Sequence, residues 1–221
     1  MQKLKKKIKT PWPTKNAMTQ IYDKHLWGGN DFDFYSGEGS HHPDIVKPYV
    51  ETVTAFLKSH QKNLSVCDLG CGDFNIGRQL APYASSYIAV DIVKDLIERN
   101  KTLFKAANLE FRCLDIAKDK LPKADCVILR QVLQHLSNKE IISIVKKLSN
   151  YKYIILTEHI PNGDFTPNID IISGQGTRLK HNSGVSVLKA PFNLKVKEET
   201  ILNEVVFDHR KGRILTFLYT M

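Results

Sequence analysis

Along most of the chain, short continuous apolar runs alternate with segments in which apolar residues recur at helical spacing. Short apolar runs typical of buried strands occupy residues 64–69, 87–91, 109–114, 125–129 and 153–157. Between them, apolar residues recur every three or four positions, which predicts helices over residues 43–60, 76–84, 93–105 and 139–149. Strands that alternate with helices in this way predict an α/β domain with a mainly parallel sheet.

Both ends of the chain depart from this alternation. Residues 194–207 and 213–219 predict a closing β-hairpin, and residues 19–27 predict a short helix. Two long loops stand apart: residues 28–42 combine glycines with aromatic rings and histidines, and residues 160–191 are too long for a simple connector. We expect residues 1–42 to form a basic tail and a lid-like extension. Residues 43–221 would form the main domain, with a substrate loop at about 160–191.

Composition and length favour one soluble α/β domain. The chain has 221 residues, with 42% hydrophobic and 25% charged residues. Its apolar runs fall short of the roughly 18 residues that a spanning helix needs. The lysine-rich start leads into no signal-type apolar core, so we expect a cytoplasmic protein. The four cysteines lie in or beside predicted strands, which favours free thiols over a metal site.

The net charge of +9 is concentrated at the start of the chain. Five lysines fall within the first ten residues, which contain no acid, and this leaves +4 (9 − 5) for the rest. We interpret this segment as a basic tail rather than an RNA-binding arm, so a nucleic-acid partner is disfavoured. Contact of the tail with anionic lipid or an acidic partner stays open.

A glycine turn follows the first strand. Gly70 and Gly72 end the apolar run of residues 64–69, and a helical pattern begins near residue 76. Glycine accepts positive φ and carries no side chain that would keep a ligand from the backbone amides, so this turn suits a nucleotide-like ligand. The dinucleotide fingerprint Gly-x-Gly-x-x-Gly requires a third glycine where the chain has Asn75, which disfavours a nicotinamide or flavin cofactor.

The sequence Asp68-Leu69-Gly70-Cys71-Gly72 resembles motif I of the class I S-adenosylmethionine-dependent methyltransferases. It departs from the commonest form because Phe74 stands at the position of the last glycine. The resemblance covers about residues 43–221. It implies a Rossmann-like methyltransferase fold: a seven-stranded, mostly parallel sheet with an antiparallel C-terminal hairpin and helices on both faces. It also implies S-adenosyl-L-methionine as cofactor, lying across Asp68, Gly70, Cys71, Gly72 and Asp73.

Acids end the next two predicted strands. Asp91 lies some twenty residues beyond Gly70, where a carboxylate can accept both ribose hydroxyls; the alternative is a helix N-cap. We place the adjoining Ile92 among the cofactor-binding residues. The resemblance implies that Asp115 accepts from the adenine amine and that Ile116 offers a backbone amide. The alternative for Asp115 is an ordinary turn aspartate.

Polar residues at the ends of the central strands are candidates for the reaction itself. Arg130 and Gln131 follow the fourth strand, and Arg130 suits either the cofactor carboxylate or an anionic substrate, unless it forms a structural salt bridge. Glu158 and His159 follow the fifth strand. We take His159 as the first candidate for a general base, with Glu158 and His41 next. A buried histidine bonded to a backbone carbonyl is the alternative.

The two long loops supply the remaining candidates for substrate binding. Tyr35 and His42 come from the first loop, and Asn168, Asp170 and Arg178 from the second, together with Arg130. A covered polar pocket favours a small-molecule substrate. Residues 34–41, Phe-Tyr-Ser-Gly-Glu-Gly-Ser-His, look like those of methyltransferases from bacterial surface-sugar pathways, which implies O-methylation of a sugar or nucleotide sugar.

Two other functions stay open for this sequence. An RNA methyltransferase would use the basic tail for phosphates. A non-catalytic module would bind the cofactor and transfer nothing. We expect a monomer or a homodimer.

Overall fold

The computed structural model describes residues 11–206 and 212–221. The basic tail of residues 1–10 and most of the hairpin connection lie outside the described residues. The helices are α1 (Thr14–Asp23), α2 (Pro43–Lys58), α3 (Gly77–Leu80), α4 (Lys94–Leu103) and α5 (Asn138–Leu148). Short 3-10 helices are η1 (Glu38–Ser40), η2 (Ala81–Tyr83), η3 (Leu133–His135) and η4 (Arg178–His181).

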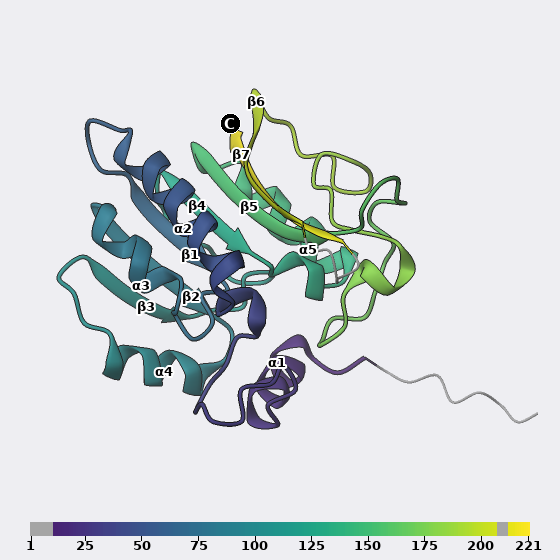
Figure 1. Cartoon of the computed structure of the whole chain (residues 1–221), viewed down its shortest axis with the longest axis horizontal. Helices are drawn as coiled ribbons and strands as arrows, with labels where there is room; N and C mark the ends of the chain where they lie inside the picture. The colour runs from purple at the N-terminus through teal and green to yellow at the C-terminus, as the bar shows by residue number, and fades with distance from the viewer. Residues whose placement is uncertain (1–10, 207–211) are drawn as a thin grey trace, which may run out of the picture.

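The strands form one seven-stranded sheet in the order β3-β2-β1-β4-β5-β7-β6 (Figure 1). They are β1 (Ser65–Leu69), β2 (Ser86–Asp91), β3 (Leu109–Cys113), β4 (Cys126–Arg130), β5 (Tyr153–Ile160), β6 (Glu198–Val206) and β7 (Arg213–Thr220). The first five run parallel, and β7 pairs antiparallel with β5 and β6. The expected mostly parallel sheet with an antiparallel hairpin is thus confirmed.

Side chains alternate between the two faces of the central strands, and each face has its own core. Val127 and Leu129 of β4 join one apolar cluster with residues of α1 and α5. Cys126 and Ile128 of the same strand join the other cluster with residues of α2 and α3. The fully buried strands therefore read as continuous apolar runs, because helices cover both faces.

The strand order creates a crevice at one edge of the sheet. β1 lies between β2 and β4: the connections after β1 and β2 lead toward one edge of the sheet, and the connection after β3 crosses back over β1 to β4. In open α/β sheets, ligands bind outside the carboxyl ends of the strands at this switch point. In Figure 1, α1 and the loop that follows it lie at this edge.

Three elements differ from those expected from the sequence. Helix α1 begins at Thr14, five residues before the expected start, and the expected helix over residues 76–84 is divided into α3 and η2. Strand β5 continues to Ile160, because its pairing with β7 extends to Ile160 and Arg213. Glu158 and His159 therefore lie within a strand rather than after it. Among the described residues, none of the helices is long and apolar enough to cross a membrane.

Candidate functional site

The turn after β1 requires its two glycines. Gly70 has a φ of 83° and Gly72 a φ of 56°, a region that residues with a β-carbon disfavour. The N–H groups of Gly70 and Cys71 donate to the carbonyl oxygen of Val90, at 2.7 and 2.9 Å, and tie the turn to β2. A β-carbon on Gly70 would lie 2.4 Å from Val132 Cγ2, so the turn packs against the segment after β4.

Phe74 occupies the place of the last glycine and still adopts the glycine-like conformation, with a φ of 65°. Its ring is fully buried and makes edge contacts with Tyr87, Phe104 and Phe111, at centroid distances of 5.9, 5.2 and 4.8 Å. Space for the ring comes from Gly77, whose β-carbon would lie 2.2 Å from Phe74 Cε2. Phe74 can therefore occupy the position of the last glycine because a glycine three residues later leaves room for its ring.

A cavity of about 330 Å³ adjoins the glycine turn, near the lower end of the usual range for small-molecule sites. Its floor comes from the ends of the parallel strands and includes Gly70, Asp91 and Arg130. Its cover comes from residues 14–41, which we call the roof segment. The roof residues that line the cavity are Thr14, Met18, Tyr22, Trp27, Ser36, Gly37, Gly39 and Ser40.

Asp91 and Asp115 line this cavity next to apolar side chains. The Asp91 carboxylate accepts the backbone N–H groups of Gly72 and Val93, at 3.1 and 3.0 Å, and burial raises its pKa. Asp115 accepts the N–H of Ala117 at 3.0 Å. Ile92 and Ile116 line the same part of the cavity. Asp91 therefore orders the glycine turn as well as facing the cavity, whereas the N-cap alternative weighed for it is wrong, because the N-cap of α4 is Val93 and has no side-chain cap.

Arg130 and Gln131 line the cavity from the end of β4. Arg130 is 9% exposed and donates to the carbonyl oxygen of Gly39 at 2.5 Å, and its guanidinium lies 4.7 Å from the centroid of the Tyr49 ring. Burial lowers its pKa. Gln131 has a φ of 56°, and its side-chain nitrogen is buried without a partner among the described residues. Two hydrogen-bond donors therefore converge on this end of the cavity.

A family model described as a methyltransferase domain matches residues 60–188, which is more than half of the chain. The chain belongs to this family. This confirms the resemblance of residues 68–72 to motif I of the class I methyltransferases. A search among curated proteins finds no match to the sequence.

Solved structures of other methyltransferases share the fold at low identity. The N-methyltransferase NodS from Bradyrhizobium japonicum, in complex with S-adenosyl-L-homocysteine, is 11% identical with a TM-score of 0.64 over 92% of this chain and 98% of that one. Magnesium protoporphyrin IX methyltransferase from Synechocystis, with bound S-adenosylmethionine, is 18% identical with a TM-score of 0.55 over 95% and 99%. The N-terminal domain of EvdMO1, with S-adenosylhomocysteine and D-fucose, is 16% identical with a TM-score of 0.57 over 93% and 96%.

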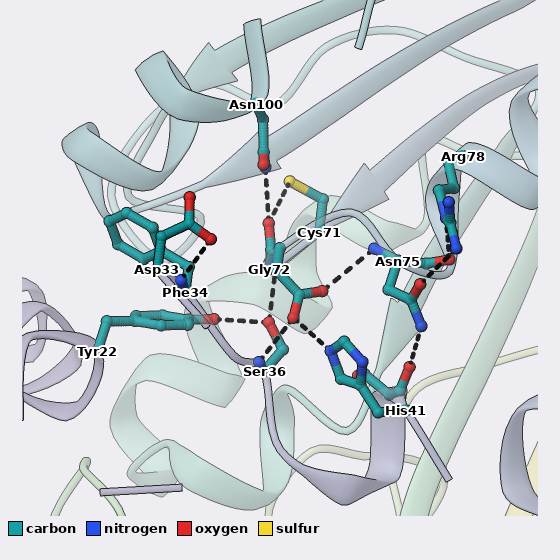
Figure 2. A network of polar contacts seen from close by, with 12 residues as sticks. Tyr22, Asp33, Phe34, Ser36, His41, Cys71, Gly72, Asn75, Arg78 and Asn100 are labelled. Atoms are coloured by element: carbon teal, nitrogen blue, oxygen red, sulfur yellow. Dashed lines mark hydrogen bonds and ion pairs between the residues drawn. The ribbon is translucent and has the colours of Figure 1, made fainter. Parts of the chain in front are cut away.

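Asp68 and Asp73 of the methyltransferase lie outside the cavity lining, although the sequence placed them on the cofactor. Asp68 is buried and accepts the hydroxyl of Tyr87 at 2.9 Å, and burial raises its pKa to about 7. Asp73 faces the roof segment instead: it accepts the N–H of Ser36 at 2.8 Å, and Ser36 Oγ accepts the N–H of Asp73 at 2.8 Å. Figure 2 shows Ser36 and His41 gathered next to Gly72 at this junction. Asp73 thus holds the roof segment against the glycine turn through two hydrogen bonds to Ser36.

His41 and Tyr35 belong to the same junction and not to the cavity wall. His41 Nε2 lies 2.6 Å from Asp73 Oδ2, and its ring stacks on Tyr35 at 4.4 Å. His42 caps α2, where its Nδ1 accepts the N–H of Asp44 at 3.3 Å. These contacts correct the expected roles of His41 as a base and of Tyr35 and His42 as substrate ligands.

Glu158 and His159 point to opposite faces of β5, and neither lines the cavity. Glu158 is fully buried and accepts the N–H groups of Leu133 and Gln134, at 3.1 and 2.9 Å; burial raises its pKa to about 8. His159 lies beside Gly212, whose β-carbon would be 3.0 Å from His159 Nε2. His159, the first candidate for a general base, is therefore not among the residues that line the cavity.

The candidates from the long loop of residues 160–191 are structural. Arg178 is 1% exposed and donates to the carbonyl oxygens of Leu136 at 2.7 Å and Ile169 at 2.9 Å, and to that of Leu133 at 3.1 Å. Asn168 uses its side-chain amide on the backbone of Ser186 and Ala190. Asp170 accepts the first N–H of α5, from Asn138, at 2.7 Å. These three side chains hold the loop in place, and none lines the cavity.

Several residues that line the cavity were not among the sequence candidates. Trp27 packs against His135 at a centroid distance of 5.1 Å, and burial lowers the pKa of His135 to about 4. Glu140 accepts hydroxyls from Thr14, Ser137 and Ser173. Within residues 11–206 and 212–221, we find no cluster of three or more histidine, cysteine or acidic side chains that could hold a metal ion.

Proposed function

We propose that this methyltransferase uses S-adenosyl-L-methionine and methylates an oxygen of a small polar acceptor, with a sugar or nucleotide sugar as the first class to test. The observation that carries the proposal is the covered cavity, which is lined both by the glycine turn and Asp91 and by Arg130 and Gln131. A site of this size, under a roof of the chain's own residues, suits one small molecule beside a cofactor better than a polymer.

The residues present fit the proposed cofactor. Gly70 and Gly72 lack the side chains that would cover the backbone at the cavity edge, and the N–H contacts of Asp91 fix its carboxylate there. In the proposed arrangement Asp91 binds the ribose hydroxyls, while Asp115 and Ile116 meet the adenine. When bound, S-adenosylmethionine supplies a methyl group on an already activated sulfonium.

The chain's own contribution is then alignment. Arg130 and Gln131 orient the acceptor, and the roof segment excludes water from the cavity. Holding two reactants in the productive geometry can lower a barrier by several kcal/mol. Such a site needs little else when the acceptor atom is already nucleophilic.

The first test is calorimetric titration with S-adenosylmethionine, S-adenosylhomocysteine and NADH. We expect selective binding of the two adenosyl sulfur compounds, and its loss in Asp91→Asn, which keeps the side-chain size but removes the charge. Asp95→Asn, an exposed acid in the first turn of α4, is the matched control and should bind normally. Binding of NADH instead, or binding that ignores Asp91, would refute the cofactor assignment.

RNA-binding and turnover assays on the same protein distinguish the other two functions from the proposed one. An RNA methyltransferase would bind RNA with an affinity that falls steeply with salt and weakens when residues 1–10 are removed. A non-catalytic module would bind the cofactor but release no S-adenosylhomocysteine with any acceptor. Turnover of small hydroxylated or acidic acceptors, unaffected by removal of residues 1–10, would support the proposal.

A further inference from the structure

Arg130 is a buried cation without a counter-ion at the cavity. Among the described residues, no carboxylate oxygen lies within ion-pair distance of its guanidinium. Its contacts are the Gly39 carbonyl oxygen at 2.5 Å, a long contact to Ser40 Oγ at 3.4 Å and the face of Tyr49. Its Nε is buried and has no hydrogen-bond partner in this part of the structure. Buried charges are normally paired, so an unpaired arginine at a cavity wall indicates an anionic ligand.

The nearby acid does not neutralise this charge. Asp68 influences Arg130, but its carboxylate accepts the hydroxyl of Tyr87 and lies outside ion-pair distance. Burial raises the pKa of Asp68 to about 7, so it is only partly ionised near neutral pH. The positive charge at the end of β4 is thus left for whatever enters the cavity.

Gln131 places a second donor next to the first. Its backbone N–H donates to the carbonyl oxygen of Thr157 at 2.7 Å, and its φ of 56° directs the chain away from the sheet. Its side chain packs against Gly39, where a β-carbon would lie 2.1 Å from the Gln131 Oε1. The side-chain Nε2 has no partner among the described residues. A guanidinium and an amide N–H₂ with unused donors suit a planar acceptor of two oxygens.

Among the described residues that line the cavity, the carboxylates are already bonded and the histidine is a weak base. The carboxylates of Asp91 and Glu140 are occupied by backbone N–H groups and hydroxyls, and Asp115 forms an ion pair with Lys118 at 2.9 Å. His135 has its Nε2 3.2 Å from the side-chain amide of Gln134, its Nδ1 is buried without a hydrogen-bond partner among the described residues, and burial lowers its pKa to about 4. A base this weak is poorly matched to the removal of a hydroxyl proton at neutral pH.

We propose that the acceptor group is a carboxylate, bound by Arg130 and Gln131, and that the product is a methyl ester. This inference rests on the proposed methyltransferase function and names its substrate class. A lone pair of the carboxylate oxygen forms the new bond to the methyl carbon, while the carbon–sulfur bond breaks and its electron pair stays on sulfur. One negative and one positive charge are consumed, and no proton moves. A hydroxyl acceptor would instead require a base stronger than the buried His135.

The charge balance favours a carboxylate over a phosphate. Among the residues that the structure describes, the cavity lining offers one unpaired cation, which matches a monoanion, and the guanidinium fork matches two coplanar oxygens. A phosphate monoester carries nearly two charges at neutral pH and would leave one of them uncompensated. Sugar acids are therefore better acceptor candidates than sugar phosphates.

The test is NMR of the Arg130 Nε–H in the ¹⁵N-labelled full chain, with the signal assigned by its absence in Arg130→Gln. The protein is first saturated with S-adenosylhomocysteine and then titrated with acetate, with methyl acetate as the neutral matched probe. We expect a saturable shift with acetate and none with methyl acetate. Arg130→Gln should bind S-adenosylhomocysteine within twofold of wild type but acetate at least tenfold more weakly.

The alternative outcomes overturn the inference in separate ways. If S-adenosylhomocysteine alone shifts the signal and acetate adds nothing, Arg130 holds the cofactor carboxylate, and the proposed function survives without the carboxylate substrate. A larger response to inorganic phosphate than to acetate, or an equal response to methyl acetate, also refutes it. If S-adenosylhomocysteine does not bind, the proposed function itself fails. If Arg130→Gln does not fold, Gln131→Asn, which tolerates the positive φ, should weaken acetate binding in the same assay.

Discussion

Replacing Gly77 by alanine tests why this glycine motif accepts a phenylalanine. The new β-carbon would lie 2.2 and 2.5 Å from Cε2 and Cδ2 of Phe74, and 3.1 Å from Asp68 Oδ2. The ring cannot move aside easily, because it is fully buried among three other aromatic rings. Overpacking of a close-packed core costs about 1–3 kcal/mol.

Helix propensity predicts the opposite sign. Gly77 is the first residue of α3, and alanine in a helix interior is favoured over glycine by up to about 1 kcal/mol. Since the steric cost exceeds this gain, we expect Gly77→Ala to lower the free energy of unfolding by about 1–2 kcal/mol. Equilibrium urea denaturation followed by circular dichroism measures the change.

The assay separates the steric cause from a general intolerance of alanine. Gly176→Ala is the matched control, because the nearest neighbour of its β-carbon would be Lys180 Nζ at 3.5 Å, and it should change stability by less than about 0.5 kcal/mol. In a Phe74→Ala background, the penalty of Gly77→Ala should disappear. A stabilising Gly77→Ala, or an equal penalty in both backgrounds, would refute the reasoning.

Three further experiments test the roof segment, the buried Arg178, and the buried acids Asp68 and Glu158. Ser36→Ala removes the acceptor of the Asp73 N–H and the partner of the Tyr22 hydroxyl, each worth about 1 kcal/mol, and should raise the dissociation rate of S-adenosylhomocysteine at least about fivefold in stopped-flow measurements. Arg178→Met leaves several buried carbonyl oxygens without donors and should cost about 3 kcal/mol or more on urea denaturation. Burial raises the pKa of Asp68 to about 7 and of Glu158 to about 8. The folded state therefore binds protons that the unfolded chain has released, and unfolding free energy should fall by a few kcal/mol from about pH 6.5 to pH 8.

Each of these changes has a control. Ser59→Ala removes an exposed hydroxyl at the end of α2 and should leave the dissociation rate unchanged. Arg112→Met breaks an exposed ion pair with Glu110 and should cost less than about 1 kcal/mol. If the unfolding free energy is constant or rises between about pH 6.5 and 8, the raised pKa values of the two buried acids are refuted. If they are correct, Glu158→Gln should make the unfolding free energy fall less steeply with pH.

The fold was predictable because its signals are local. The apolar runs and helical periods gave five strands and the major helices within a few residues, and the glycine pair marked the turn. Asp91 and Arg130 were found because a strand end at a switch point has a known direction. Helix α5 was also expected, and the capping box of Ser137 and Glu140 explains where it begins.

Side-chain direction over long sequence separations was not predictable. Asp73 was assigned to the cofactor from its neighbours Gly70 and Gly72, but its partner Ser36 is 37 residues away. His159 was assigned to the active site because the strand was expected to end at residue 157. Pairing with β7, near the end of the chain, lengthens that strand and fixes which side chain faces which way. No pattern near either residue carries this information.

What separates functional from structural charges in this protein is hydrogen-bond satisfaction rather than burial. Glu158 and Arg178 are more buried than Arg130, yet backbone groups on the segment after β4 occupy their carboxylate and guanidinium. Arg130 and Gln131 keep unused donors at a cavity wall. Leaving a buried donor unpaired costs about 1–3 kcal/mol, and these two lie on residues that line the cavity, where a ligand could complete them. The first pair thus holds the wall in place, and the second pair is the one that we propose for binding the acceptor.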